Sequence, residues 1–265
     1  MDIDQNKKLR DAQKDHFNQI ADEYIKIRKS NNSHLFYKKL LWRYVFSNLN
    51  LKGKNFKLVE PMCGYAEGYF IVKNYSQIDI EEYYGFDYSE NIVNYCKKNL
   101  NFLNIDFLDI INFNTSNLYD MGIIIGGLHH VYKESDKAIL NISRSLKDKA
   151  VFINFEPTFE LKIIEYIRSK IYKFNKFFDE NTEKDFRLDK LNKKFEQNNL
   201  LLVKNFKVGF LGYILFYNPD VFPIFSKIPR LFVSLLFNID ILLSKIFILN
   251  KISFATISVY KKTNK

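Results

Sequence analysis

Residues 56–68 read FKLVEPMCGYAEG, and this stretch decides the fold class more than any other part of the chain. The apolar pair Leu58 and Val59 marks the end of a buried parallel strand, and Glu60 stands at its carboxyl tip. Gly64 follows in a turn, where a missing side chain lets the backbone pass close to a ligand. Because ligands of open α/β sheets bind beyond the carboxyl ends of the strands, the stretch predicts a binding turn after the first strand.

The next hundred residues alternate between strand and helix patterns. We expect strands over 56–60, 82–87, 102–106, 120–125 and 149–155, and helices over 66–75, 89–100 and 134–147. Strands separated by helical stretches imply right-handed βαβ units and a parallel sheet. The fold class is therefore α/β, with a mostly parallel sheet and helices on both faces.

The segments on either side of this region follow other patterns. Apolar residues at helical spacing predict helices over 16–28 and 33–49. After Pro157 we expect helices over 159–178 and 184–198, strands over 200–210 and 251–261, and an apolar helical segment within 219–249. We expect residues 1–50 to form a helical N-terminal segment and residues 51–265 to form the main domain.

The length, composition and charge of the chain limit the classes of protein to which it can belong. The chain has 265 residues, of which 47% are hydrophobic and 26% charged, so a sizeable core is expected. The formal charge of +10 comes from lysines scattered along the chain, which favours a generic basic surface, suited to an anionic substrate, over a nucleic-acid footprint. Cys63 and Cys96 give neither a disulfide framework nor zinc spacing, and the polar start has no signal-peptide core. These features predict a cytoplasmic protein without a metal, the amino-acid bias indicates an AT-rich genome, and we expect the source to be a bacterium.

Carboxylates follow the second and third expected strands. Asp87 ends the second strand, where an acidic residue suits the two hydroxyls of a ribose, although it could instead cap the next helix beside Ser89. Asp106 follows the third strand, where it could accept a hydrogen bond from an adenine amino group while Phe107 stacks alongside. Asp109 is a plausible substitute for Asp106.

The fourth expected strand runs into the sequence GGLHH at 126–130. Two glycines and two histidines are unusual for a purely structural turn at the end of a central strand. Histidine titrates near neutral pH and can take a proton from a substrate hydroxyl, so His129 and His130 are candidates for a general base. A histidine whose hydrogen bonds are satisfied at a helix start is an equally good interpretation.

Taken in order, these features resemble the class I S-adenosylmethionine-dependent methyltransferases. The resemblance rests on the acidic and glycine positions of 60–68, 85–87, 106 and 120–130, and on 144–147 before the fifth strand, and it covers about residues 15–156. It implies a seven-stranded sheet of order 3-2-1-4-5-7-6 with an antiparallel strand seven. It also implies S-adenosylmethionine as cofactor, S-adenosylhomocysteine as product, and a cofactor site that includes Tyr24, Glu60, Met62, Cys63, Gly64, Asp87, Tyr88, Asp106, Phe107 and Gly126.

The resemblance also implies that residues 1–50 form an N-terminal lid over a class I methyltransferase domain at 51–265, in which 157–199 and 211–249 shape the substrate pocket. It adds one further detail and is imperfect in two places. The stretch 15–24 looks like the lid helix of small-molecule members, which places Tyr24 over the cofactor, although Tyr24 is also compatible with a core position. Met62 and Ala66 replace the usual glycines of the binding turn, and residues 148–149 replace a glycine pair. We expect the substitutions to alter the loops without abolishing the cofactor site, because every acidic position is present.

The function that the resemblance implies is methyl transfer to a small molecule, and the basic, aromatic-rich substrate segments would suit a phosphorylated or nucleotide-linked acceptor. We favour O-methylation of a sugar, sugar nucleotide or surface-polysaccharide precursor, with His129 or His130 as base and His16 and Glu156 in reserve. An amine acceptor would need no base. The alternatives are methylation of a lipid or quinone-type acceptor at a membrane surface, a non-catalytic protein that keeps the fold, and an RNA methyltransferase. No nucleic-acid partner is expected, because no nucleic-acid-binding module is visible.

The apolar segment 219–249 contains a hydrophobic stripe at helical spacing, but polar residues interrupt it. A membrane-spanning helix of about 20 apolar residues is therefore not supported. We expect a helix that packs in the core or over the active site. The nearby Lys227, Arg230 and Lys245 also allow a peripheral contact with the inner membrane surface.

Overall fold

The structure is a computed structural model that describes residues 3–49, 51–173, 177 and 182–263. Its centre is a mixed sheet in the order β3-β2-β1-β4-β5-β8-β7, to which the two-residue strand β6 adds by pairing with β5. The strands are β1 (Lys52–Pro61), β2 (Gln77–Asp87), β3 (Asn104–Phe107), β4 (Tyr119–Ile125), β5 (Leu146–Phe159), β6 (Phe186–Arg187), β7 (Leu200–Lys207) and β8 (Ala255–Lys262). Only β8 runs antiparallel to its neighbours β5 and β7. The expected seven-strand order is confirmed, since β7 and β8 are its sixth and seventh strands.

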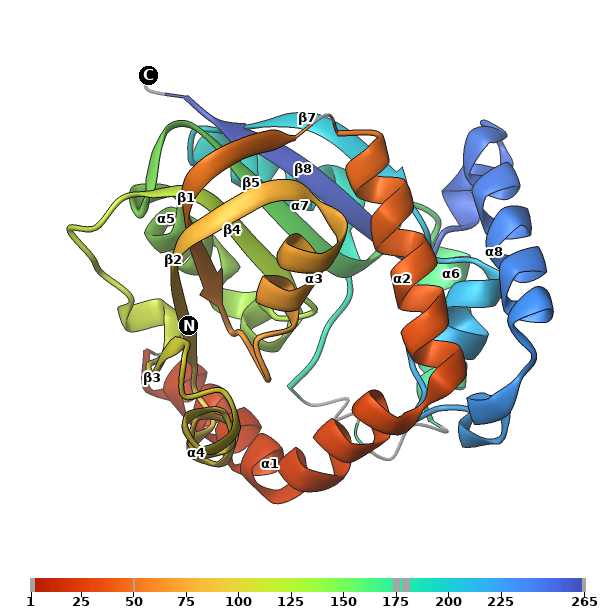
Figure 1. The fold of residues 1–265 in the computed structure, drawn as a ribbon, viewed down its shortest axis with the longest axis horizontal. Coiled ribbons are helices and arrows are strands. Elements are labelled where there is room, and N and C mark those ends of the chain that lie inside the picture. Colours follow the sequence, from red (N-terminus) through yellow and green to blue (C-terminus); the bar gives the residue numbers. More distant parts are fainter. Residues whose placement is uncertain (1–2, 50, 174–176, 178–181, 264–265) are drawn as a thin grey trace.

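Helices cover both faces of this sheet and one of its edges (Figure 1). The α-helices are α1 (Ile3–Ser30), α2 (Asn32–Ser47), α3 (Glu67–Tyr75), α4 (Glu90–Asn99), α5 (Ser135–Arg144), α6 (Lys162–Tyr172), α7 (Leu188–Gln197) and α8 (Arg230–Lys245). Short helical turns are η1 (Ile110–Asn112), η2 (Leu128–Glu134), η3 (Tyr213–Tyr217), η4 (Pro223–Lys227) and η5 (Leu249–Ile252). In Figure 1, α1 crosses below the ends of β1 and β2, where the strands point, and α8 lies at the right-hand edge beyond α2.

Several elements are longer than the sequence pattern indicates. The first helix begins at Ile3. The apolar spacing by which a helix is recognised indicated only residues 16–28, because the first turns of the helix are polar. Strand β5 continues to Phe159, so Glu156 lies inside the strand and not at its end, opposite Thr256 of β8. The apolar segment 219–249 is divided into η4, α8 and the start of η5, as Pro223 and Pro229 dictate.

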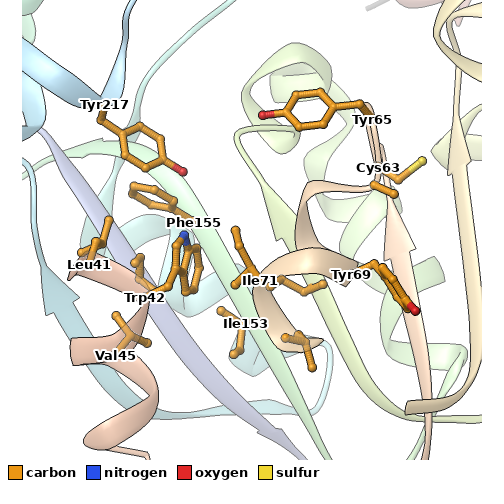
Figure 2. Packing of buried hydrophobic residues seen from close by; sticks show 14 of the residues in the cluster. Leu41, Trp42, Val45, Cys63, Tyr65, Tyr69, Ile71, Ile153, Phe155 and Tyr217 are labelled. Atoms are coloured by element: carbon orange, nitrogen blue, oxygen red, sulfur yellow. The ribbon is translucent and has the colours of Figure 1, made fainter. Parts of the chain in front are cut away.

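The core on the α2 side of the sheet is aromatic. Trp42 of α2 is fully buried and meets Phe155 of β5 edge to face at 5.9 Å between ring centroids. Tyr217 of η3 contacts the same Phe155 ring at 4.9 Å (Figure 2). Edge-to-face aromatic pairs are favourable beyond the area they bury. This packing fixes α2 and η3 against β5, and η3 then borders the pocket described below.

Candidate active site

The turn after β1 has an unusual backbone. Met62, Gly64 and Ala66 all have positive φ, at 51°, 52° and 61° respectively. A side-chain carbon added to Gly64 would meet no atom within 4 Å, so the glycine faces open space. The turn therefore keeps the left-handed conformation of a glycine-rich loop even where Met62 and Ala66 stand, and it leaves a cradle at Gly64 that a ligand can approach.

Ala66→Gly is expected to stabilise the protein by about 1 kcal/mol, because the left-handed region costs an L-residue about that much more than glycine. Chemical denaturation of the variant and the parent chain measures the difference. The matched control is Ala138→Gly, in the middle of α5, where glycine is expected to destabilise by about 1 kcal/mol. Equal destabilisation by both substitutions would show that Ala66 is not strained.

Two carboxylates at the strand ends hold this turn in place. Glu60 accepts hydrogen bonds from the backbone N–H groups of Gly68 (2.6 Å) and Tyr69 (2.9 Å) and from the Tyr83 hydroxyl (2.8 Å). Burial raises the pKa of Glu60 to about 8, against these bonds. Asp87 accepts from the N–H groups of Gly64 and Ser89, both at 2.9 Å. The two side chains thus join the turn to β2 and to the starts of α3 and α4.

A pocket of about 860 Å³, including its open mouth, lies in front of this turn, and we call it the β1 pocket. Its lining is drawn from the ends of β1, β2 and β4 and from α1 above them. The lining includes Arg10, Gln13, Lys14, Phe17, Tyr24, Glu60, Met62, Cys63, Gly64, Tyr65, Glu67, Asp87, Tyr88, Ser89, Ile92, Asp109, Ile110, Ile125, Gly126, Gly127, His130 and Val131. The size suits a small-molecule ligand. Of the ten residues expected at the cofactor, all but Asp106 and Phe107 line this pocket.

The expected placement of Asp106 and Phe107 on the pocket is wrong. Asp106 is exposed on β3, in register with Phe86 of β2. Phe107 stacks on Tyr88 at 5.4 Å, outside the lining. The strand is too short for its last residues to reach the pocket, and Asp109 takes that position instead, where it caps η1 and accepts a hydrogen bond from Arg10 at 2.8 Å.

Helix α1 supplies the roof of the pocket. Tyr24 lies in the lining, with the Arg28 guanidinium 4.4 Å from its ring centroid. His16 is on the same helix but lines neither pocket, and its Nε2 atom lies 2.8 Å from the carbonyl oxygen of Phe177. His16 is therefore not placed to meet an acceptor.

A second pocket, of about 820 Å³ with its mouth, adjoins the first, and we call it the β5 pocket. Its lining includes Phe17, Tyr24, Arg28, Glu67, Ile125, Gly126, His129, His130, Phe155, Glu156, Pro157, Arg168, Phe177, Glu183, Asp185, Tyr213, Tyr217, Asn218 and Asp220. Both pockets share Phe17, Tyr24, Glu67, Ile125, Gly126 and His130. Gly126, with φ of 61°, thus stands where the two pockets meet.

A buried histidine–glutamate pair lies in the β5 pocket. Nδ1 of His129 is 2.8 Å from Oε2 of Glu156, whose Oε1 accepts the N–H groups of Gly127 (2.9 Å) and Leu128 (2.7 Å). Nε2 of His129 faces Glu183 at 3.7 Å, which is too long for a hydrogen bond. The pair therefore holds the ring by Nδ1 and leaves Nε2 directed into the pocket.

Burial sets the ionisation of this pair. It raises the pKa of Glu156 to about 8 and, with the Arg168 guanidinium nearby, lowers the pKa of His129 to about 3. At neutral pH the carboxyl of Glu156 therefore keeps its proton and the imidazole of His129 is uncharged, so the pair carries no net charge. This proton is lost as the pH rises through the pKa of Glu156.

The second histidine has different partners. Nδ1 of His130 lies 2.8 Å from the side-chain amide of Gln13, and its ring contacts Phe17 at 5.0 Å between centroids. Ligand atoms of His129, His130 and Glu183 all lie within 4.8 Å of one another, so these side chains have the spacing to hold a metal ion. In the part of the chain that the structure describes, they are the one such group, and Gln13 already occupies Nδ1 of His130.

The remaining charged groups of the β5 pocket could not be found from the sequence. Arg28 pairs with Asp220 at 2.9 Å, and Arg168 pairs with Asp185 at 3.2 Å. They belong to α1, to α6 and to loops between the later elements, where no motif marks them. The only sequence signal was the occurrence of charged residues in otherwise apolar segments, and this signal does not separate buried charges from surface charges.

Comparisons with known proteins agree with this architecture. Residues 62–154 match a family model described as a methyltransferase domain. No curated protein sequence matches the chain. A structure from the complex between the Haloferax volcanii Trm112 methyltransferase activator and a methyltransferase aligns over 95% of this chain and 98% of that chain, with a TM-score of 0.62 and 10% identity.

Two further solved structures cover nearly the whole chain. A methyltransferase of Archaeoglobus fulgidus that depends on S-adenosylmethionine aligns over 91% of this chain and 99% of its own, with a TM-score of 0.58 and 17% identity. Magnesium protoporphyrin IX methyltransferase of Synechocystis PCC 6803, with bound S-adenosylhomocysteine, aligns over 94% and 98%, with a TM-score of 0.57 and 13% identity. At such identities the structures establish the fold, while the family match lies on the segment from the binding turn to β5. The sheet has the strand order expected for class I S-adenosylmethionine-dependent methyltransferases, and its central part, residues 62–154, matches a methyltransferase domain.

Proposed function

We propose that this methyltransferase O-methylates a hydroxyl group of a polar small molecule, namely a sugar, a sugar nucleotide or a surface-polysaccharide precursor. The observation that carries the proposal is the His129–Glu156 pair, which directs Nε2 of a neutral imidazole into a polar pocket beside Gly126. A hydroxyl acceptor must lose its proton during methyl transfer, and Nε2 has a free lone pair to take it once Glu156 is ionised and accepts Nδ1–H.

The cofactor fits the β1 pocket, where Gly64 leaves the open cradle. We assign the methionine part to the side of Glu60 and Gly64, and the ribose hydroxyls to Asp87. Asp109 replaces Asp106 as the candidate acceptor for the adenine amino group, because only Asp109 lines the pocket. Tyr24 covers the cofactor from α1, and Gly126 lies beside the transferred methyl group.

The protein aligns the cofactor with the acceptor and removes the proton of the acceptor hydroxyl. When bound, S-adenosylmethionine supplies the methyl group, whose bond to sulfur breaks as the bond to the acceptor oxygen forms and leaves a neutral thioether. Glu156 holds His129 through Nδ1, so that Nε2 accepts the proton of the acceptor hydroxyl. Phe17 and Tyr24, which border both pockets, exclude water from the junction.

The lining of the β5 pocket favours a hydroxyl-rich acceptor over a quinone or a phosphate. Two guanidinium groups, of Arg28 and Arg168, face five carboxyl groups, of Glu67, Glu156, Glu183, Asp185 and Asp220. Carboxylates accept hydrogen bonds from hydroxyl groups and repel phosphates. A phosphate or nucleotide attached to the acceptor therefore belongs outside this pocket, toward the basic surface. A quinone ring would leave these charged groups without partners.

The same excess of carboxylates favours a second candidate function, N-methylation of an amine. An amine binds near carboxylates and needs no base once it is neutral. His129→Gln separates the candidates, because it removes the base while leaving the carboxylates in place. Methyl transfer to a hydroxyl acceptor is then expected to slow, whereas methyl transfer to a neutral amine is expected to keep its rate.

The test is methyl transfer from radiolabelled S-adenosylmethionine to sugar nucleotides, free sugars, amines, quinols and RNA. We expect labelled product with a saccharide and none with a quinol or RNA. Calorimetric titration with S-adenosylmethionine and S-adenosylhomocysteine runs alongside. Cofactor binding without turnover of any saccharide would overturn the acceptor assignment, and absent binding in folded protein would favour a non-catalytic role.

Removal of divalent metal is expected to leave methyl transfer unchanged. The Nδ1 atoms of His129 and His130 already have hydrogen-bond partners, in Glu156 and Gln13, and Gln13 also donates to Glu183. Activity measured after dialysis against EDTA checks this expectation. A loss of activity that manganese or zinc restores would instead assign a metal ion to His129, His130 and Glu183.

A further inference from the structure

An apolar surface runs along the outer side of α8, and it is separate from both pockets. Leu231, Leu235 and Leu242 are spaced by four and seven residues, so they share one side of the helix. Leu231 is 81% exposed, Phe232 57% and Leu242 60%. Phe247 and Ile248, just beyond the helix, are 73% and 75% exposed. We call these six residues the α8 face.

The opposite side of α8 is well packed. Val233 and Phe237 are buried, and Phe237 meets Tyr37 of α2 at 5.8 Å between ring centroids. Asp240 is 1% exposed and accepts hydrogen bonds from the Tyr37 hydroxyl (2.7 Å) and the N–H of Gly212 (3.0 Å). The helix is therefore firmly seated, and the α8 face is exposed because the fold directs it outward, at the edge of the molecule in Figure 1.

Charge around the α8 face has one sign. Lys227, Arg230 and Lys245 flank it, and all three are exposed. Between Val221 and Lys262 the sequence contains a single acidic residue, the buried Asp240. An apolar helix side bordered only by cations is suited to an anionic lipid surface, where the apolar groups enter the acyl boundary and the cations meet the headgroups.

We propose that the α8 face docks the protein on an anionic lipid bilayer, with α8 lying in the plane of the interface. None of the described helices is long and apolar enough to cross a membrane, so the contact is peripheral. A second copy of the chain fits this face poorly, because a two-fold contact would bring the same cations together. The proposal does not depend on which acceptor is methylated.

Helix α8 is also linked to the wall of the acceptor pocket. Through Asp240, α8 holds the backbone of Gly212 and Tyr213, where η3 begins. Tyr213 and Tyr217 of η3 line the β5 pocket. The buried side of α8 thus contacts the segment that borders the proposed acceptor site.

Vesicle flotation of the full chain tests the proposal. We expect binding to vesicles of phosphatidylglycerol and phosphatidylcholine, and little binding to phosphatidylcholine alone. Leu231→Ser with Phe232→Ser is expected to weaken binding at least tenfold, since both side chains then lose their burial in lipid. Arg230→Glu is expected to weaken it by about fivefold or more, as expected for losing one cation at an anionic surface.

The control is Val203→Ser on β7, which removes an equally exposed apolar side chain outside the α8 face. Thermal unfolding of each variant verifies that it is folded. Absent binding to anionic vesicles overturns the proposal, as does equal binding to neutral vesicles or an equal loss with Val203→Ser. Concentration-dependent dimerisation that Leu231→Ser abolishes, without vesicle binding, would assign the face to a second copy.

Discussion

Glu156→Gln is expected to lower methyl transfer to a hydroxyl acceptor by about 10²- to 10⁴-fold, the usual contribution of a positioned base. Glutamine is nearly isosteric and still accepts the N–H groups of Gly127 and Leu128 through its carbonyl oxygen. Its amide donates to Nδ1 of His129, however, and this fixes the tautomer in which Nε2 carries the hydrogen. The imidazole then has no lone pair to offer the acceptor.

The ionisation of Glu156 sets the pH dependence of the rate of methyl transfer. Below the pKa of Glu156, which burial raises to about 8, the carboxyl keeps its proton and donates it to Nδ1. Nε2 is then protonated and cannot act as a base. Above the pKa of Glu156, the carboxylate accepts a hydrogen bond from Nδ1–H, and the lone pair of Nε2 is free to accept a proton. The rate is therefore expected to rise with pH through about 8 in the parent chain and to lose this rise in Glu156→Gln.

Two measurements separate this positioning role from a structural one. Calorimetry is expected to give unchanged affinity for S-adenosylmethionine in Glu156→Gln, because Glu156 does not line the β1 pocket. His16→Gln, which changes a histidine outside both pockets, is expected to keep the parent rate and pH profile. An unchanged rate in Glu156→Gln would remove His129 as the base.

Asp87→Ala is expected to weaken S-adenosylmethionine binding by at least 100-fold. The substitution removes the proposed acceptor of the ribose hydroxyls, and a hydrogen bond to a charged group contributes about 1.5–3 kcal/mol. It also frees the N–H of Gly64, so the binding turn loses its side-chain tie to β2 and keeps the backbone hydrogen bond from Cys63 to Phe86. Calorimetric titration with S-adenosylhomocysteine measures the loss without turnover.

The matched control is Asp106→Ala, which removes an aspartate from the neighbouring strand outside the pocket. It is expected to leave the affinity within about twofold of the parent, as for a surface substitution. Weakening by Asp106→Ala as large as by Asp87→Ala would return the adenine contact to Asp106. Full affinity in Asp87→Ala would place the ribose elsewhere.

Much of the fold followed from local sequence pattern. The alternation of strand and helix and the turn at 62–66 are properties of segments, whereas the resemblance supplied the strand order and the antiparallel last strand. Asp106 shows the limit, because β3 is four residues long and a shift of three positions moves a side chain from the surface to the pocket rim. Sequence spacing cannot resolve where so short a strand ends.

Contacts between distant segments could not be predicted from the sequence. His129 and Glu156 were both candidates, but their bond depends on the register between β4 and β5 and on the turn after Gly126. Asp240 was considered an interruption of an apolar stripe, whereas it is a buried acceptor for the start of η3. Glu183 comes from the segment after β5, which carries no repeated pattern.

Helix α1 borders both pockets, since Phe17 and Tyr24 line each of them. The helix cannot move away from the spent cofactor without also uncovering the acceptor. Cofactor exchange that moves α1 would therefore also open the acceptor pocket. We expect the enzyme to be distributive for this reason: an acceptor with two methylation sites would be released after the first transfer and would return for the second.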